Sequence, residues 1–248
     1  MRLTIQFRPK NGTLILPINY EEVLQGFLYR SIQDFELANF LHDFGYMKEK
    51  RRFKMFTFSR LSGTYRIHRQ EKEIEFFDEV TWQVSSLLDS LIFDLARNYL
   101  LKEQFLLNGQ PIHIEETVVK SKEIAEKCSY QIRMLSPLTV YSTYENRYGE
   151  KRTHFFSPFD PVFSDMVEKN FCNKFQAYFQ EQPTERITIK PKKVTQKDKV
   201  VTTFKDFRIN AWNGTFEIQA PLSYLKFMYE VGIGAKNSQG FGMFEIIE

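Results

Sequence analysis

The sequence predicts an α+β fold made of two tandem ferredoxin-like domains, which are also called RRM-like and have the order β-α-β-β-α-β. Three observations lead to this prediction. Segments with alternating apolar and polar residues, typical of strands, are separated by segments with apolar residues at helical spacing. The same order of segments occurs in each half of the chain. A C-terminal glycine-rich loop precedes the last predicted strand.

The first half of the chain supplies one copy of this order. Residues 3–7 alternate as in a half-buried strand, and Glu21–Ile32 carries apolar residues at helical spacing. Asp34 is suited to cap a short second helix that continues to Leu41 and is stopped by Gly45. The other predicted elements are strands at Phe53–Phe58, Tyr65–His68 and Ile74–Trp82, a long helix at Ser85–Phe105, and a closing strand through Ile112, Ile114 and Val118.

The second half repeats the architecture, although no sequence period is visible. Residues 196–198 are the predicted turn of a hairpin, and Pro221 stands in the first turn of a helix, where proline is favoured. The charged stretch Lys120–Lys127 suggests a boundary, which gives domains at 1–122 and 128–248. The predicted elements are strands at Ser129–Met134 and Leu138–Ser142, a helix at Asp160–Phe179, hairpin strands at Ile187–Val194 and Val200–Ile209, a strand at Gly214–Ala220, the helix after Pro221, and an edge strand at Met243–Ile247.

Composition excludes several classes of protein. A length of 248 residues with 42% hydrophobic residues suits one large or two small domains with a substantial core. The two cysteines, Cys128 and Cys172, are far apart, which argues against a zinc site or a disulfide framework. The N-terminus lacks the apolar core of a signal peptide, and no run is long enough to span a membrane. We therefore expect a cytoplasmic protein that has no membrane partner and needs neither metal nor cofactor.

Positive charge is concentrated in two places, although the net charge is only +3. Residues 48–54 carry five positive charges and one negative charge, and a second basic stretch runs from Arg186 to Arg208. Such runs are often solvated faces. Because phenylalanine and tyrosine are interleaved with both runs, the pattern favours a polyanion as partner.

The glycine-rich loop, Gly232–Gly242, has four of the chain's eleven glycines and one lysine, Lys236. Glycine permits positive φ and close approach, so a phosphate backbone is a suitable ligand. The loop is not a Walker A motif, because no Gly-Lys-Ser/Thr ends it, and it lacks the third glycine of a dinucleotide fingerprint. Residues 239–246 loosely follow the RNA-recognition octamer of RRM domains. A tight turn into the last strand is the alternative interpretation.

Four segments together resemble the CRISPR-associated repeat-processing endoribonucleases, the sixth Cas family of the RAMP superfamily. Gly232–Gly242 fits that family's pattern of Gly-h-Gly, five residues and Gly-h-Gly, in which h is hydrophobic. Leu41–Tyr46 is similar to its N-terminal histidine segment, Phe53–Ser59 to the following strand, and Leu135–Leu138 to the start of its second domain. The resemblance spans the whole chain.

The resemblance implies a metal-independent endoribonuclease that cleaves CRISPR precursor RNA within its repeats. Attack by a 2′-hydroxyl would give a cyclic phosphate and a 5′-hydroxyl. The implied partners are CRISPR repeat RNA, subunits of a CRISPR effector complex and a second copy of the chain as a homodimer. The alternative is a non-catalytic RAMP subunit that binds repeat or guide RNA in an effector complex. A general tandem-RRM protein ranks last, because the octamer is degenerate and terminal.

The candidate catalytic residue is His42, whose side chain has a pKa suited to proton transfer at neutral pH. The predicted helix end beside it favours the protonated form. The resemblance implies Tyr29 as a base or as the group that orients the hydroxyl, and Lys48 as the cation that stabilises the phosphorane. Ordinary surface or helix roles are the alternatives for all three. The candidate RNA-binding residues are Lys50, Arg51, Arg52, Lys54, His154, Gly232, Gly234, Lys236, Gly240 and Gly242.

Overall fold

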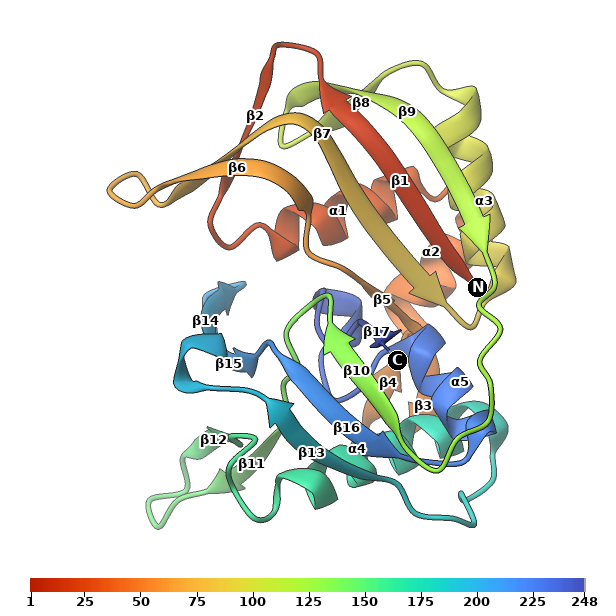
Figure 1. The fold of residues 1–248 in the computed structure, drawn as a ribbon, viewed down its shortest axis with the longest axis vertical. Coiled ribbons are helices and arrows are strands. Elements are labelled where there is room, and N and C mark those ends of the chain that lie inside the picture. Colours follow the sequence, from red (N-terminus) through yellow and green to blue (C-terminus); the bar gives the residue numbers. More distant parts are fainter. Residues whose placement is uncertain (248) are drawn as a thin grey trace.

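The computed structural model describes residues 1–247, which form two main β-sheets (Figure 1). The first sheet and its helices come from residues 2–120, and the second set comes from residues 130–247. Each sheet packs with two long helices over its own hydrophobic core. An irregular segment, residues 121–127, connects the two sets.

The first set contains nine strands and three helices. Their bounds are β1 (Arg2–Pro9), β2 (Thr13–Pro17), α1 (Glu21–Ser31), α2 (Phe35–Asn39), β3 (Tyr46–Lys48), β4 (Arg51–Phe53), β5 (Phe56–Phe58), β6 (Ser62–His68), β7 (Glu73–Ser86), α3 (Asp89–Leu101), β8 (Phe105–Leu107) and β9 (Gln110–Lys120).

The second set contains eight strands and two helices. Their bounds are β10 (Tyr130–Met134), β11 (Tyr141–Glu145), β12 (Lys151–Phe155), α4 (Phe163–Phe179), β13 (Thr188–Lys193), β14 (Lys199–Phe204), β15 (Phe207–Trp212), β16 (Thr215–Gln219), α5 (Leu222–Val231) and β17 (Phe244–Ile247).

The strand order confirms the predicted fold class. In the first sheet β1 lies between β9 and β7, and β7 pairs on its other side with β5 and β6. In the second sheet β10 lies between β17 and β16, with β13 outermost. Both orders follow the 4-1-3-2 arrangement that a β-α-β-β-α-β chain forms, and every pairing is antiparallel. The last strand is an edge strand, as predicted.

Two predicted elements are wrong in their bounds. The hairpin expected around residues 196–198 does not form, because β13 joins the main sheet and β14 pairs with β15. The turn lies instead at Lys205 and Asp206, both of which have positive φ. The long helix begins at Asp89 rather than Ser85, because Ser85 and Ser86 extend β7 and pair with β1 and β5.

The strand predicted at Leu138–Ser142 also lies elsewhere. Leu138 forms only an isolated bridge with Trp212, and the strand begins at Tyr141, where β11 pairs with β12. This ribbon and the β14–β15 ribbon project beside the second sheet (Figure 1). The strands β2, β3, β8 and β12 were not predicted from the sequence.

The two halves meet where the basic run follows the short N-terminal helices. The β3–β4 ribbon packs on α4, with the rings of Tyr46 and Tyr178 4.9 Å apart. Met55, between β4 and β5, is buried in the core of the second half. The Thr57 hydroxyl of β5 donates a 2.9 Å hydrogen bond to the carbonyl of Phe241 in the glycine-rich loop. Two segments from opposite ends of the chain therefore adjoin.

None of the helices in residues 1–247 combines the length and the apolar character needed to cross a bilayer.

Candidate nucleic-acid interface and active site

His42 lies on a π-helical turn, Phe40–Phe44, which follows α2 and ends at Gly45. Gly45 has φ 67°, and a Cβ there would meet the Phe53 carbonyl oxygen at 2.7 Å, so glycine is required. Leu41 is buried and anchors the turn. The His42 side chain is 74% exposed, which leaves the imidazole open to a ligand.

The His42 ring has a hydrogen-bonding neighbour in the next residue. Its Nδ1 lies 2.6 Å from Oδ1 of Asp43. When the proton is on Nδ1, it is donated to this carboxylate, and Nε2 is then the free nitrogen of the ring. With this hydrogen bond formed, Nε2 is the ring nitrogen that remains for a substrate.

Tyr29 lies beside this histidine, as the sequence analysis expected of a catalytic partner. The two ring centroids are 5.9 Å apart and the planes are nearly perpendicular. The Tyr29 hydroxyl donates to the carbonyl of Leu41 at 3.3 Å. Burial raises the pKa of Tyr29 to about 12, so the phenol keeps its proton at neutral pH. This chemistry suits a group that orients a hydroxyl better than it suits a base.

Two cations contact the His42 turn directly. Lys54 Nζ donates to the His42 carbonyl at 2.8 Å, and the Arg52 guanidinium donates to the Asp43 carbonyl. Burial, and then the neighbouring Arg52, lower the pKa of Lys54. Lys48 has a different neighbour, because its ammonium donates to the side chain of Gln176 on α4. In the β3–β4 ribbon Lys48 stands opposite Arg51, whereas Arg52 stands opposite Met47.

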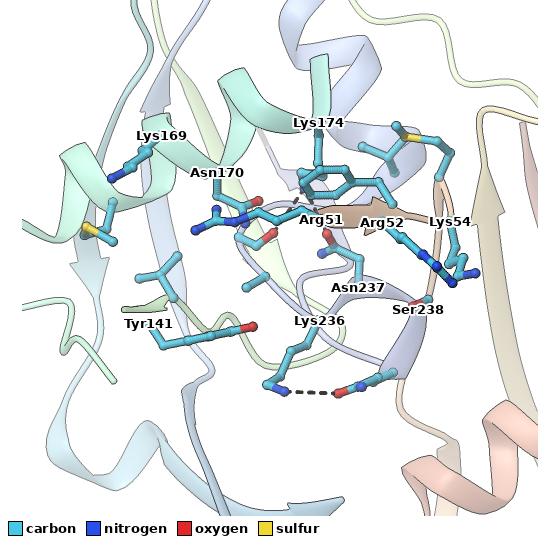
Figure 2. Close-up of a pocket in the computed structure, with 18 of the residues that line it drawn as sticks. Arg51, Arg52, Lys54, Tyr141, Lys169, Asn170, Lys174, Lys236, Asn237 and Ser238 are labelled. Atoms are coloured by element: carbon cyan, nitrogen blue, oxygen red, sulfur yellow. Dashed lines mark hydrogen bonds between the residues drawn. The ribbon is translucent and has the colours of Figure 1, made fainter. Parts of the chain in front are cut away.

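A cleft of about 540 Å³ opens between the basic run, α4 and the glycine-rich loop. Figure 2 shows its labelled polar side chains coming from these three places and from β11, which contributes Tyr141. Within the described chain, its lining includes six cationic residues and no aspartate or glutamate. Because the described part of this lining has positive and no negative side chains, it attracts the phosphates of a polyanion. The six residues are Arg51, Arg52, Lys54, Lys169, Lys174 and Lys236.

Five candidate RNA-binding residues lie outside this lining: three are the loop glycines Gly232, Gly240 and Gly242, and the other two are Lys50 and His154. Lys50 is exposed in the turn between β3 and β4. His154 is exposed on β12, where its ring packs on Phe156 with centroids 4.7 Å apart. Arg52 and Lys54 connect the cleft to the His42 turn, because both line the cleft and both donate to the turn.

The glycine-rich loop is built around the buried side chain of Lys174. The Lys174 ammonium donates to the Gly232 carbonyl, to the Gly234 carbonyl at 3.1 Å and to Asn237 Oδ1 at 2.9 Å. The Asn237 amide in turn donates to the carbonyls of Ile233 and Phe241, at 3.1 and 2.9 Å. Burial lowers the pKa of Lys174 to about 7.

The four glycines of the loop are buried, and their positive φ values range from 71° to 86°. A Cβ on Gly240 would meet the Phe58 ring at 2.5 Å, and one on Gly242 would overlap the Ile233 carbonyl oxygen. The glycines of this loop thus shape it from within. Lys236, Ser238 and Gln239 are the loop residues that present side chains to the cleft.

Sequence reasoning missed most of the lining; four of the missed polar residues are Tyr141, Lys169, Asn170 and Lys174. The sequence pattern could have predicted the burial of Lys174, because this lysine follows Val167 and Phe171 at the spacing of the buried face of α4. A lysine at a core position of a helix indicates a buried polar contact. The other three are ordinary exposed or half-buried residues whose position depends on tertiary structure.

Among residues 1–247, no three His, Cys, Asp or Glu side chains gather at a spacing suited to holding a metal ion.

Comparison with known proteins gives matches along almost the whole chain. Residues 15–117 match the family model "CRISPR-associated protein Cas6, N-terminal", and residues 119–246 match "CRISPR associated protein Cas6, C-terminal". The chain is 27% identical over 257 residues to CRISPR-associated endoribonuclease Cas6 1 of Methanocaldococcus jannaschii, covering 100% of this chain and 93% of the relative. It is 25% identical over 258 residues to CRISPR-associated endoribonuclease Cas6 of Pyrococcus furiosus, covering 99% and 90%.

A solved structure described as a RAMP protein binding different RNA substrates has the same fold. It superposes with a TM-score of 0.82 at 24% identity, and the match covers 100% of both chains.

Proposed function

The chain belongs to the Cas6 family of CRISPR-associated proteins, and on this basis we propose that it is an endoribonuclease that cleaves CRISPR precursor RNA within its repeats. Relatives that match it over nearly their whole length are named CRISPR-associated endoribonucleases. The observation that carries the proposal is the cleft whose described lining has six cationic residues, five of them not buried, and no aspartate or glutamate, and which continues through Arg52 and Lys54 to the exposed His42.

The proposed reaction is metal-independent and uses a 2′-hydroxyl of the RNA as nucleophile. The hydroxyl oxygen attacks the adjacent phosphorus, and its proton passes to a base. The bond to the 5′-oxygen breaks, and an acid protonates that oxygen. The products are a 2′,3′-cyclic phosphate and a 5′-hydroxyl. This route is supported by the side chains around the site, which are the His42 imidazole beside the Asp43 carboxylate, the Tyr29 phenol, and the cations Arg52 and Lys54.

His42 is the proposed acid or base, with Nε2 as the reacting nitrogen. Tyr29 would orient the 2′-hydroxyl, because its high pKa disfavours loss of its own proton. Lys48 remains our proposal for the cation that stabilises the phosphorane, although Gln176 holds its ammonium. Arg52 and Lys54, which touch the His42 turn, are the additional cations that we propose for this role.

RNA binding is assigned to the cleft and its surroundings. We propose that Arg51, Arg52, Lys54 and Lys236 contact phosphates, that Lys50 and His154 extend this surface, and that Gly232, Gly234, Gly240 and Gly242 shape the loop that bears Lys236. Division into domains at 1–122 and 128–248, a cytoplasmic location, a homodimer and contact with effector-complex subunits are further proposals.

The test is cleavage of the host's repeat RNA in EDTA, with His42→Ala beside the wild-type protein. We expect the wild type to cut once per repeat and His42→Ala to cut at least about 100-fold more slowly. His113→Ala is the matched control, because His113 is also exposed but lies on β9. Equal rates for His42→Ala and the wild type would show that His42 has no catalytic role.

The product ends test the chemistry separately. A polynucleotide kinase should label the downstream fragment without prior phosphatase treatment, because its 5′-end carries a hydroxyl. The upstream fragment should resist phosphatase until acid opens its cyclic phosphate. A requirement for added divalent ion, or a 5′-phosphate on the product, would contradict the proposed route.

The alternative is a non-catalytic subunit that binds repeat or guide RNA in an effector complex. One observation favours it: the Tyr29 hydroxyl and the Lys48 ammonium are both engaged by other protein groups. It predicts tight binding of repeat RNA with no cleavage by the wild type at any pH or salt concentration, so the same experiment separates the two functions.

A further inference from the structure

Lys236 lies at the edge of the cleft between two aromatic rings. Its Nζ is 5.2 Å from the ring centroid of Tyr141 and 5.1 Å from that of Phe207. Gln239 Oε1, at 3.5 Å, is its hydrogen-bond acceptor. Within residues 1–247 no carboxylate oxygen lies within 4 Å of this ammonium. A cation without an anionic partner is therefore held by ring faces and one amide.

The two rings come from different ribbons but share a support. Phe155 lies between them, with its ring centroid 5.6 Å from that of Tyr141 and 6.2 Å from that of Phe207. Phe155 packs against a small core that includes Phe241 of the glycine-rich loop. Because the loop contributes both Phe241 and Lys236, the same small core supports the two rings and the backbone that bears Lys236.

Both rings are open to a ligand. Phe207 is 45% exposed and begins β15 directly after the turn at Lys205 and Asp206. Tyr141 lines the cleft, and Figure 2 shows it on the same side of the opening as Lys236. A nucleotide placed here would continue into the cationic lining formed by Arg51 and Lys169.

We propose that Tyr141, Phe207 and Lys236 form a subsite for one unpaired nucleotide, whose base stacks on an aromatic ring while its phosphate binds the Lys236 ammonium. This inference rests on the proposed function, since it requires RNA in the cleft. It adds that the nucleotide of the RNA bound at this position is unpaired.

Binding of a nucleotide would replace the contacts of Lys236 with the rings by two new contacts, one of the ammonium with a phosphate and one of a ring with a base. An ammonium over a ring is weakly held at a partly exposed site, whereas a charge-assisted hydrogen bond to phosphate is among the stronger contacts of a protein. When the phosphate draws Lys236 away, a ring face becomes free. A base then covers that face, and stacking of this kind works for any base.

The subsite selects against a duplex. In a double helix both faces of a base are covered by its neighbours, so the base reaches a protein ring only after leaving the stack. RNA that is unpaired here binds without that cost. We therefore expect the protein to prefer a repeat that is unstructured at this position over the same sequence annealed to its complement.

The experiment measures binding of fluorescein-labelled repeat RNA in the His42→Ala background, so that no cleavage occurs. Phe207→Leu keeps an apolar side chain but removes the ring, whereas Phe207→Tyr keeps the ring. We expect Phe207→Leu to weaken binding by about 5- to 100-fold and Phe207→Tyr to bind like the parent. Tyr141→Leu is the second variant, and Tyr65→Leu, on the exposed strand β6 of the first half, is the matched control.

An abasic scan of the RNA identifies the base. One nucleotide should be found whose abasic replacement weakens binding to the parent, yet has little further effect on Phe207→Leu, because both changes remove the same contact. Melting curves confirm that each variant is folded.

The outcomes separate the two proposals. Parent-like binding by both leucine variants, or equal losses for Phe207→Leu and Phe207→Tyr, overturns the stacking subsite and leaves the proposed function intact. Equal affinity for single-stranded and annealed RNA overturns it as well. Absence of RNA binding by the parent protein overturns the proposed function itself.

Discussion

The glycine-rich loop and the His42 turn are both short irregular segments that depend on glycines with positive φ, but they are held in opposite ways. The loop is buried, and a fully buried ammonium from α4 satisfies three of its oxygens. The turn is exposed, and its carbonyls receive hydrogen bonds from Lys54, Arg52 and the Tyr29 hydroxyl at the protein surface.

The difference indicates that the loop positions side chains, whereas the turn leaves His42 accessible. A loop whose backbone is satisfied internally keeps one shape, so the side chains it presents to the cleft are placed in advance. In the proposed reaction the His42 imidazole gains or loses a proton, so it needs access to solvent and substrate. Substitutions in the loop should therefore act on stability, and substitutions in the turn on the reaction.

The largest expected effect comes from Gly242→Ala. A Cβ there would overlap the Ile233 carbonyl oxygen and approach Asn237 Nδ2 at 2.6 Å, and neither group has room to move within the buried loop. We expect the free energy of unfolding to fall by about 4 kcal/mol or more, measured by urea denaturation. This loss is a large part of the stability of a typical domain.

Gly149→Ala is the matched control for that prediction. Gly149 has the same φ of 76°, but a Cβ there would have nothing within 4 Å. The control measures the cost of positive φ alone, which is about 1 kcal/mol. If the two variants lost equal stability, packing around the glycine-rich loop would not be what fixes it.

A comparison of two lysines gives the next effect. Lys174→Met keeps most of the apolar stem but leaves three buried oxygens without their donor, so we expect a loss of about 3 kcal/mol. Lys54→Met removes one hydrogen bond from a half-exposed side chain and should cost less than about 1 kcal/mol. In the cleavage assay with folded protein we expect the opposite order: Lys54→Met should lose more activity than Lys174→Met, because Lys54 contacts the His42 turn. A stability loss as large for Lys54→Met as for Lys174→Met would contradict the comparison.

The sequence predicted the fold well because strands and helices have local periodicities, and the order of elements then restricts the topology. It predicted the β14–β15 turn wrongly, because Lys205-Asp206 contains no glycine or asparagine to indicate its positive φ, and only the backbone geometry identifies the turn. For the candidate site, the motifs named His42 and Tyr29, whose rings the structure places side by side, and the glycine-rich loop. They could not separate Lys48 from Arg52 and Lys54, because neighbouring residues of a ribbon point to opposite faces.

The smallest effect is a pH dependence of stability that comes from Lys174 beneath the glycine-rich loop. Burial lowers the pKa of Lys174 to about 7 in the native state, whereas the unfolded chain keeps the ordinary value of 10.5. Between these values the unfolded chain binds the proton that the native protein has released, so stability rises with pH, by at most about 1.4 kcal/mol per pH unit. Below about pH 7 both states are protonated and the contribution is constant. Urea denaturation of the wild type and Lys174→Met from pH 6 to 9 isolates this slope, since the methionine variant lacks the titration. Parallel stability curves for the two proteins would mean that the three oxygens around Lys174 hold its proton as firmly as water does.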